Sequence, residues 1–176
     1  MTSEALITLA NLGRPRRPSG VSAAFAEPVL PSTGAATEQL GPLIQGPVTD
    51  AELRGLRQLQ RIAARISGAL LDGAMPEASD LNELARDSSA HVELSVVGGE
   101  LRQELVWTEG STAGYLARRI IGELADLEPG RVRQCARREC TLLFYDTTRS
   151  RTRRWHAEDP CGWRERQRSR RAAGVR

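Results

Sequence analysis

The sequence contains no lysine, so arginine carries all 25 of its basic charges. Aromatic residues are also scarce: there are seven in 176 residues, and six of them lie at or after Trp107. The front part of any core must therefore be built from aliphatic side chains. No stretch approaches the ~18 consecutive apolar residues of a transmembrane helix, and residues 1–17 lack the apolar core of a secretory signal. No membrane partner is expected.

Cysteine is rare as well. The chain has three cysteines, and all of them lie within residues 135–161. An odd number of cysteines argues against a closed disulfide framework, so we expect a reducing, cytoplasmic setting.

Charge is unevenly distributed along the chain. Residues 131–176 contain 14 arginines against five acids, which gives +9, whereas residues 1–130 contain 11 arginines against 17 acids, which gives −6. An acidic body followed by a basic tail indicates a polyanionic partner at the C-terminal end.

A long amphipathic helix is predicted over about residues 50–72. Thr49 and Glu52 have the spacing of a capping box, and Gly73 provides the stop signal. The apolar residues that recur at helical spacing are Leu53, Leu56, Leu59, Ile62, Ala63, Ile66, Ala69 and Leu70.

Shorter elements surround this helix. Residues 3–12 form a short apolar segment, and residues 13–48 are rich in Gly, Pro, Ser and Thr, which predicts a long loop. A short helix is predicted to open at Ser79 or Asp80, and another at Ser111 that ends before Glu128.

A β-hairpin is predicted near residues 91–107. Residues 91–97 and 101–107 are β-prone and flank Gly98-Gly99-Glu100, which is typical of a tight turn. The fold class is therefore α+β, with a mainly helical N-terminal domain at 1–130 and a small C-terminal module at 131–176.

The chemistry is concentrated in the C-terminal module. Cys135 and Cys140 are separated by four residues, 15 more lead to His156, and four more lead to Cys161. Zinc prefers four thiolate or imidazole ligands in a tetrahedron, and two short loops supply two ligands each. Four protein ligands leave no open position for a substrate. We therefore expect one structural Zn²⁺ ion rather than a catalytic one.

Two other interpretations of these residues are weaker. In the first, no metal is bound, and the residues are three free thiols and a surface histidine. His91 is the only rival to His156, and it lies on the predicted hairpin. His156-Ala157-Glu158 followed by Pro160-Cys161 is similar to the deaminase signature, but the spacing does not fit. In that signature the Pro-Cys comes from a separate helix well downstream, with another cysteine three residues on, whereas position 164 here is Arg. No nucleotide-binding loop or catalytic triad order is evident, so no enzyme is expected.

Residues 131–171 resemble the CGNR zinc finger, which combines a cysteine pair, an F-x-D-[ST]-[ST]-R run, RRW-C and then CGNR before a basic helix. The matching residues are Cys135, Cys140, Phe144, Asp146, Thr147, Thr148, Arg149, Arg153, Arg154, Trp155, Cys161, Gly162 and Arg164. His156 replaces the usual third cysteine, which imidazole tolerates because it also binds zinc. Trp163 replaces the usual asparagine.

Upstream, the chain is similar to the ABATE domain that precedes this finger in bacterial proteins. The apolar start, the long helix, the LNEL segment and the hairpin come in the order of that domain. The resemblance implies a stress-linked transcription regulator. Its N-terminal domain would serve in sensing, dimerisation or partner contact, which leaves a homodimer open.

Arginine-rich segments flank the second ligand pair, and guanidinium groups suit phosphate and guanine edges. DNA is the expected partner. RNA or ribosome binding, a protein-interaction finger without nucleic acid, and a merely solvated tail stay open. The candidate contact residues are Arg149, Arg151, Arg153, Arg154, Arg164, Arg166, Arg168, Arg170 and Arg171.

Three further residue patterns concern the same function. Gly13–Pro18 resembles the core of a minor-groove AT-hook. Trp155 is expected to belong to the small core of the finger rather than to stack on a base, whereas the role of Trp163 stays open.

Overall fold

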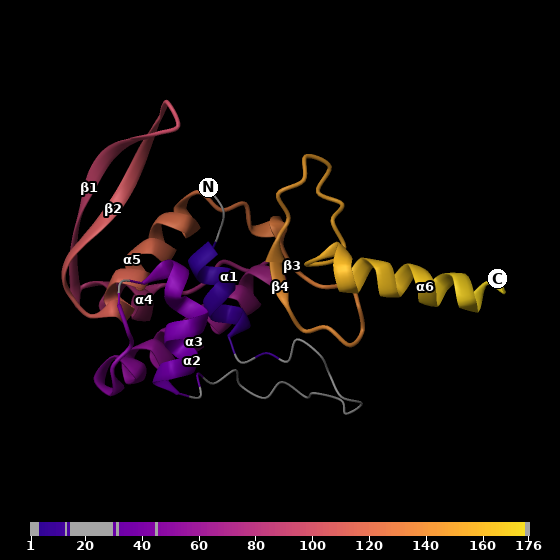
Figure 1. Cartoon of the computed structure of the whole chain (residues 1–176), viewed down its shortest axis with the longest axis horizontal. Coiled ribbons are helices and arrows are strands. Elements are labelled where there is room, and N and C mark those ends of the chain that lie inside the picture. Colours follow the sequence, from indigo (N-terminus) through magenta and orange to yellow (C-terminus); the bar gives the residue numbers. More distant parts are fainter. Residues whose placement is uncertain (1–3, 13, 15–29, 31, 45, 175–176) are drawn as a thin grey trace.

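A computed structural model describes residues 4–12, 14, 30, 32–44 and 46–174. It is helix-rich with two separate antiparallel hairpins, which confirms the α+β class (Figure 1). No helix within the described ranges is long and apolar enough to cross a membrane. The elements are α1 Glu4–Asn11, α2 Thr33–Leu40, η1 Gly41–Leu43, α3 Asp50–Leu71, α4 Ser79–Ala85, β1 Ser88–Val97, β2 Glu100–Gly110, α5 Thr112–Ala125, η2 Pro129–Arg131, β3 Val132–Gln134, β4 Leu143–Tyr145, η3 Glu158–Gly162 and α6 Trp163–Ala172.

The long helix α3 is the centre of the body, as predicted. Its capping box is present: the Glu52 backbone N–H donates to Thr49 Oγ1 at 3.3 Å, and the Thr49 N–H donates to the Glu52 carboxylate at 2.8 Å. The apolar stripe of α3 is buried against α1 and α5. Aliphatic burial along this stripe therefore builds the main core without an early aromatic residue.

Helix α2 corrects one expectation. Residues 33–43 were predicted to belong to a long loop, but they form α2 and the turn η1. Ser32 caps α2 by accepting a hydrogen bond from the Ala35 N–H at 3.2 Å, and Ala36 and Leu40 are buried. Burial of these two side chains outweighs the local loop preference of Gly and Thr.

The predicted first hairpin is present and is longer than expected, because β1 and β2 span Ser88–Gly110. Gly98 and Gly99 both have positive φ values, +61° and +83°, as a two-residue turn of this kind requires. Gly110 closes the far end of β2. A Cβ atom there would approach the Asp87 carbonyl oxygen to 2.3 Å, and its φ is +101°.

The second hairpin, β3–β4, packs on the body rather than standing apart from it. Val132 belongs to the main core, and Tyr145 packs against it. Asn11, at the end of α1, bonds both backbone groups of Leu143: it donates to the carbonyl at 2.9 Å and accepts from the N–H at 2.8 Å. The start of the predicted C-terminal module is thus fastened to α1.

A buried carboxylate fastens the other end of α1. The Glu123 side chain accepts the Ala5 N–H at 2.8 Å and the Leu6 N–H at 3.0 Å. These donors belong to the first turn of α1, where a helix has no internal acceptor for them. Burial raises the pKa of Glu123, and the two backbone bonds partly offset that rise.

We expect Glu123→Ala to lower the free energy of unfolding by about 1–3 kcal/mol, because two buried N–H groups lose their acceptor. Glu123→Gln keeps one acceptor oxygen and should lose less. Urea denaturation of both variants and of the wild type at pH 7 measures the difference. Equal stability of Glu123→Ala and the wild type would contradict this role.

The raised pKa of Glu123 also predicts a pH dependence. The folded chain binds this proton more tightly than the unfolded chain does. The contribution of Glu123 to stability is therefore largest below the ordinary pKa of 4.5 and decreases as the pH rises through the higher folded-state value. Relative to Glu123→Gln, the wild type should lose stability between about pH 4.5 and neutral pH, as measured by denaturation at each pH.

Candidate metal centre

Two short loops carry the predicted metal ligands. The first connects β3 to β4 and contains Cys135 and Cys140, whose backbone N–H groups donate to the carbonyls of Leu142 and Arg137, each at 2.9 Å. The second loop contains His156 and leads into η3, where Cys161 is buried. The Ala136 N–H donates to the Arg154 carbonyl at 2.8 Å, so the backbones of the two loops are joined directly.

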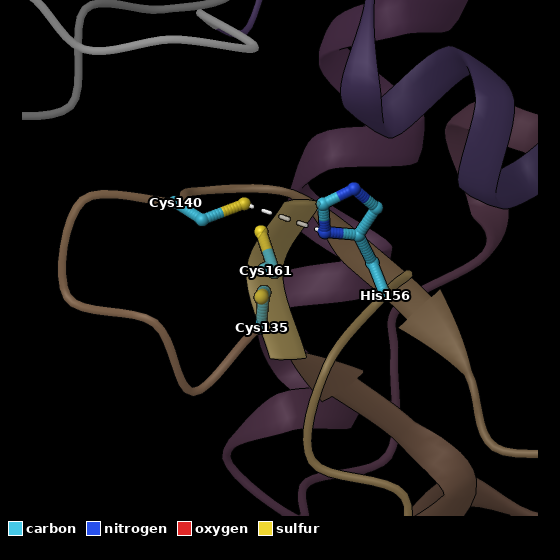
Figure 2. Close-up of side chains that lie close together, drawn as sticks. All are labelled: Cys135, Cys140, His156 and Cys161. Carbon is cyan, nitrogen blue, oxygen red and sulfur yellow. Dashed lines mark hydrogen bonds between the residues drawn. The ribbon is translucent and has the colours of Figure 1, made fainter. Parts of the chain in front are cut away.

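The four side chains converge on one point (Figure 2). The sulfur atoms of Cys135, Cys140 and Cys161 and a ring nitrogen of His156 all lie within 4.8 Å of one another. The Cys140 Sγ to His156 Nδ1 distance is 3.5 Å. A tetrahedral zinc site with its usual bond lengths has edges of about 3.6–3.8 Å, so the donor set fits zinc in both chemistry and size.

The close approach of the three buried cysteines is best explained by a bound cation. Burial raises the pKa of the Cys140 thiol to about 12, and the nearby Cys135 and Cys161 add to the shift. Burial also raises the pKa of Cys161, where the nearby Cys135 again contributes. Three buried sulfurs at this spacing become stable thiolates when a metal ion compensates their charge. Such a set of four donors belongs to the class of closed, structural zinc sites.

Similarity to a known protein family supports this class of zinc site. Residues 131–173 match the family model described as CGNR zinc finger. No curated protein matches the chain. The C-terminal region is therefore a zinc-binding module that is similar to the CGNR zinc finger, and the prediction of one structural zinc ion is confirmed. The similarity of residues 1–130 to the ABATE domain stays a prediction.

His156 is the histidine at the site, as the sequence indicated. Its rival His91 lies far away in β1, where its ring interacts with the exposed Glu93 carboxylate at 2.7 Å. Trp155 packs against a small cluster formed by the three cysteines and Leu142, in agreement with its expected core role. Trp163 is 54% exposed at the start of α6, and α6 begins without a side-chain cap.

A buried carboxylate shapes the loop between the ligand pairs. Asp146 is fully buried. It accepts hydrogen bonds from the Thr148 N–H at 2.9 Å, the Thr148 hydroxyl at 2.6 Å and the Arg153 N–H at 3.0 Å. Burial alone would raise the pKa of Asp146, but these bonds outweigh it and hold that pKa below its usual value. The sequence showed Asp146 as a motif residue without assigning this role.

Two arginines, Arg153 and Arg137, interact with the residues that carry the ligands rather than with solvent alone. The Arg153 guanidinium donates to the carbonyls of Trp155, at 2.9 Å, and His156, and it lies over the Phe144 ring. These bonds fix the backbone that carries the histidine ligand. The Arg137 side chain interacts with the Cys161 sulfur and with Glu139. Its positive charge offsets the negative charge that three thiolates and one imidazole leave on a zinc site.

The other predicted arginines differ in their surroundings. Arg151 pairs with Glu128, Arg166 pairs with Glu158, and Arg168 lies 3.2 Å from Glu139. Arg154 and Arg166 lie over the Trp155 ring. Within the described part of the chain, the remaining predicted arginines are exposed and have no ion-pair or hydrogen-bond partner; they are Arg149, Arg164, Arg170 and Arg171.

Two further arginines lie in or beside the zinc module. Arg138, between the first two ligands, is also exposed and was not among the predicted contact residues. The AT-hook-like pattern at 13–18 lies outside the described residues except for Arg14. The Arg14 guanidinium donates to the carbonyls of Ala10 and Thr141, each at 2.8 Å.

We expect Cys140→Ala to abolish stoichiometric zinc binding and to unfold the two ligand loops and α6, because the free energy of metal binding is their folding free energy. The β3–β4 hairpin should stay packed on the body. His156→Cys, which restores the usual ligand type of the family, should retain one zinc ion per chain. Metal content by mass spectrometry and hydrogen exchange over residues 131–173 provide the measurement. A Cys140→Ala protein with one zinc and a protected finger would contradict the assignment.

Asp146→Ala should destabilise the zinc-loaded protein by about 1–3 kcal/mol, because three partly buried hydrogen bonds from the loop to this acceptor are lost. It should also speed the loss of zinc to a chelator. Thr147→Ala is the matched control, since Thr147 is exposed and lies in the same loop. Urea denaturation and chelator competition test both variants. If the two substitutions had equal effects, Asp146 would not organise the loop.

Proposed function

We propose that this protein is a DNA-binding transcription regulator whose zinc finger engages the duplex through α6. The observation that carries the proposal is the character of this helix. Its ten residues include five arginines and one acid, and none of them is buried. Figure 1 shows α6 projecting away from the body, with its C-terminal end free of other elements.

A helix of this kind has little to stabilise it alone. Ten residues, eight of them polar, are marginal as an isolated helix in water, and the helix contributes no apolar face to a core. Its first residue follows Cys161 and Gly162 directly, so the metal site fixes where the helix starts. Its length of about 15 Å and its arginine surface suit the major groove of DNA, which is about 12 Å wide.

The predicted arginines divide into three groups in this proposal. Those that lack an internal partner contact phosphates, because their guanidinium groups are available without breaking an ion pair. They are Arg149, Arg164, Arg170 and Arg171, together with Arg154, which lies over the Trp155 ring. Arg153 positions the histidine loop instead, and Arg151, Arg166 and Arg168 must exchange a carboxylate for a phosphate.

The body, residues 1–130, serves in this proposal for sensing, dimerisation or partner contact. Its net negative charge supports a role other than direct contact with a polyanion. Trp163 is exposed at the start of α6, so its aromatic ring would lie next to the DNA groove that this helix is proposed to enter.

The triple variant Arg164→Gln/Arg170→Gln/Arg171→Gln should weaken duplex binding and reduce the slope of log affinity against log salt by about 3, or one unit for each lost phosphate contact. The wild-type slope should be near −4 to −5 if about five phosphates are neutralised. Fluorescence anisotropy of a labelled duplex at several salt concentrations, with zinc-loaded full-length protein, measures both quantities.

The matched control removes the same charge from the body. Arg54, Arg61 and Arg86 are exposed there, so Arg54→Gln/Arg61→Gln/Arg86→Gln should leave the slope unchanged. Competition between duplex DNA and a structured RNA at fixed salt separates a DNA-binding from an RNA-binding function. Equal effects of the two triple variants, or no duplex binding by the zinc-loaded wild type at low salt, would refute the proposal.

A further inference from the structure

The β1–β2 hairpin has one apolar and one polar face. Cross-strand partners share a face, and the pairs Val92–Leu105, Leu94–Gln103 and Val96–Leu101 follow one another on the same side. The opposite side holds the pairs His91–Val106, Glu93–Glu104, Ser95–Arg102 and Val97–Glu100. We call the first side the apolar face; its residues are Ala90, Val92, Leu94, Val96, Leu101, Gln103, Leu105 and Trp107.

The base of the apolar face is covered by the body. Trp107 stacks on Tyr115 of α5, with ring centroids 5.7 Å apart, and Leu105 also packs against the main core. The Tyr115 hydroxyl donates to the Leu105 carbonyl at 3.4 Å. The apolar face therefore continues the main core outward, and its base is fixed by packing against α5.

The outer half of the apolar face extends beyond the helices into solvent (Figure 1). Val92 is 58% exposed, Leu94 70%, and Val96 and Leu101 69% each. Together they present on the order of 400 Å² of apolar surface, which is within the size range of the largest patch on a typical monomer. It is also about half of the ~800 Å² that one partner buries in a standard interface.

We infer that this outer half is a homodimer interface, in which the apolar faces of two hairpins stack about a two-fold axis. Two sheets that pack face to face lie about 10 Å apart and interdigitate their side chains. Stacking covers the four exposed aliphatic side chains of each copy. The remaining area comes from the polar rim and the neighbouring surface of the body.

The distribution of charge favours a second copy as the occupant. Every charged residue of the paired positions 90–107 lies on the polar face, so two stacked apolar faces oppose no like charges across the interface. The polar faces, with Glu93 and Glu104 side by side in each copy, stay in solvent. Edge-to-edge pairing of the hairpins would instead leave the aliphatic side chains exposed.

Gln103 supports the two-fold arrangement. It is the one polar residue of the exposed half of the apolar face and lies in its middle row, opposite Leu94. A side-chain amide carries both donors and an acceptor, so it pairs with its own copy across a two-fold axis. The face is thus self-complementary, as an isologous interface requires.

The test measures oligomeric state with full-length, zinc-loaded protein. Sedimentation or light scattering at about 100 μM should find a wild-type dimer. Leu94→Glu places a charge at the centre of the apolar face and should weaken dimerisation by 100-fold or more. Val97→Glu places the same charge on the polar face of the same hairpin, where it should leave the dimer intact.

A second measurement covers the case in which Leu94→Glu fails to fold, which circular dichroism and zinc content reveal. Cysteine replaces Gln103 in one variant and Ser95, on the polar face, in another, and a short bis-maleimide is added. Gln103→Cys should cross-link between copies and Ser95→Cys should not. A monomeric wild type at this concentration, equal behaviour of Leu94→Glu and Val97→Glu, or equal cross-linking would overturn the inference. Since none of these readouts involves DNA, failure of the proposed function would leave them unchanged.

Discussion

The arrangement of the C-terminal region depends on four side chains meeting at one cation. Leu142 and Trp155 are the only side chains besides the cysteines in the small cluster identified there within the described residues, and so small a core does not hold two loops together. The metal ion joins the loop after β3 to the loop before η3. Because α6 starts two residues after the last ligand, Cys161, the direction of the arginine-rich helix is also set by this site. The fold of the C-terminal region and the position of its proposed DNA-binding surface therefore both depend on the zinc site.

A series of hydrogen bonds made by polar side chains connects the zinc site to the helices of the body. Asp146 accepts a hydrogen bond from the Arg153 N–H within the loop between the two ligand pairs, and the Arg153 side chain donates to the backbone carbonyl of His156. Asn11 then joins β4 to α1, and Glu123 joins α1 to α5. Asn11 and Glu123 bond residues distant in the sequence, whereas Asp146 and Arg153 bond residues within their own loop. Each of these polar groups has hydrogen-bond partners, which is how burial of charge becomes tolerable. The orientation of the finger on the body is thus determined by a few specific bonds in addition to apolar packing.

These bonds also explain what sequence reasoning reached and what it missed. Helix α3 and the four ligands were predictable because a capping box, helical periodicity and a set of metal donors are local patterns with few alternatives. Helix α2 was missed because its stability comes from burial of Ala36 and Leu40 against distant residues. The adjacent Arg153 and Arg154 look equivalent in the sequence, yet the Arg153 guanidinium bonds two carbonyls and the Arg154 guanidinium lies over the Trp155 ring. Which way a long side chain turns is decided by tertiary structure.

The two proposals are compatible because of where the surfaces lie. The β1–β2 hairpin and α6 are at opposite ends of the molecule (Figure 1), so stacked hairpins would leave both arginine-rich helices clear of the dimer interface. A single ten-residue helix reaches few base edges, and most of its arginine contacts would go to phosphate, which carries no sequence information. Two copies related by a two-fold axis would instead meet two half-sites of a symmetric DNA sequence at a fixed separation. Specificity would then come from the rigid distance set by the body as much as from the side chains of either finger.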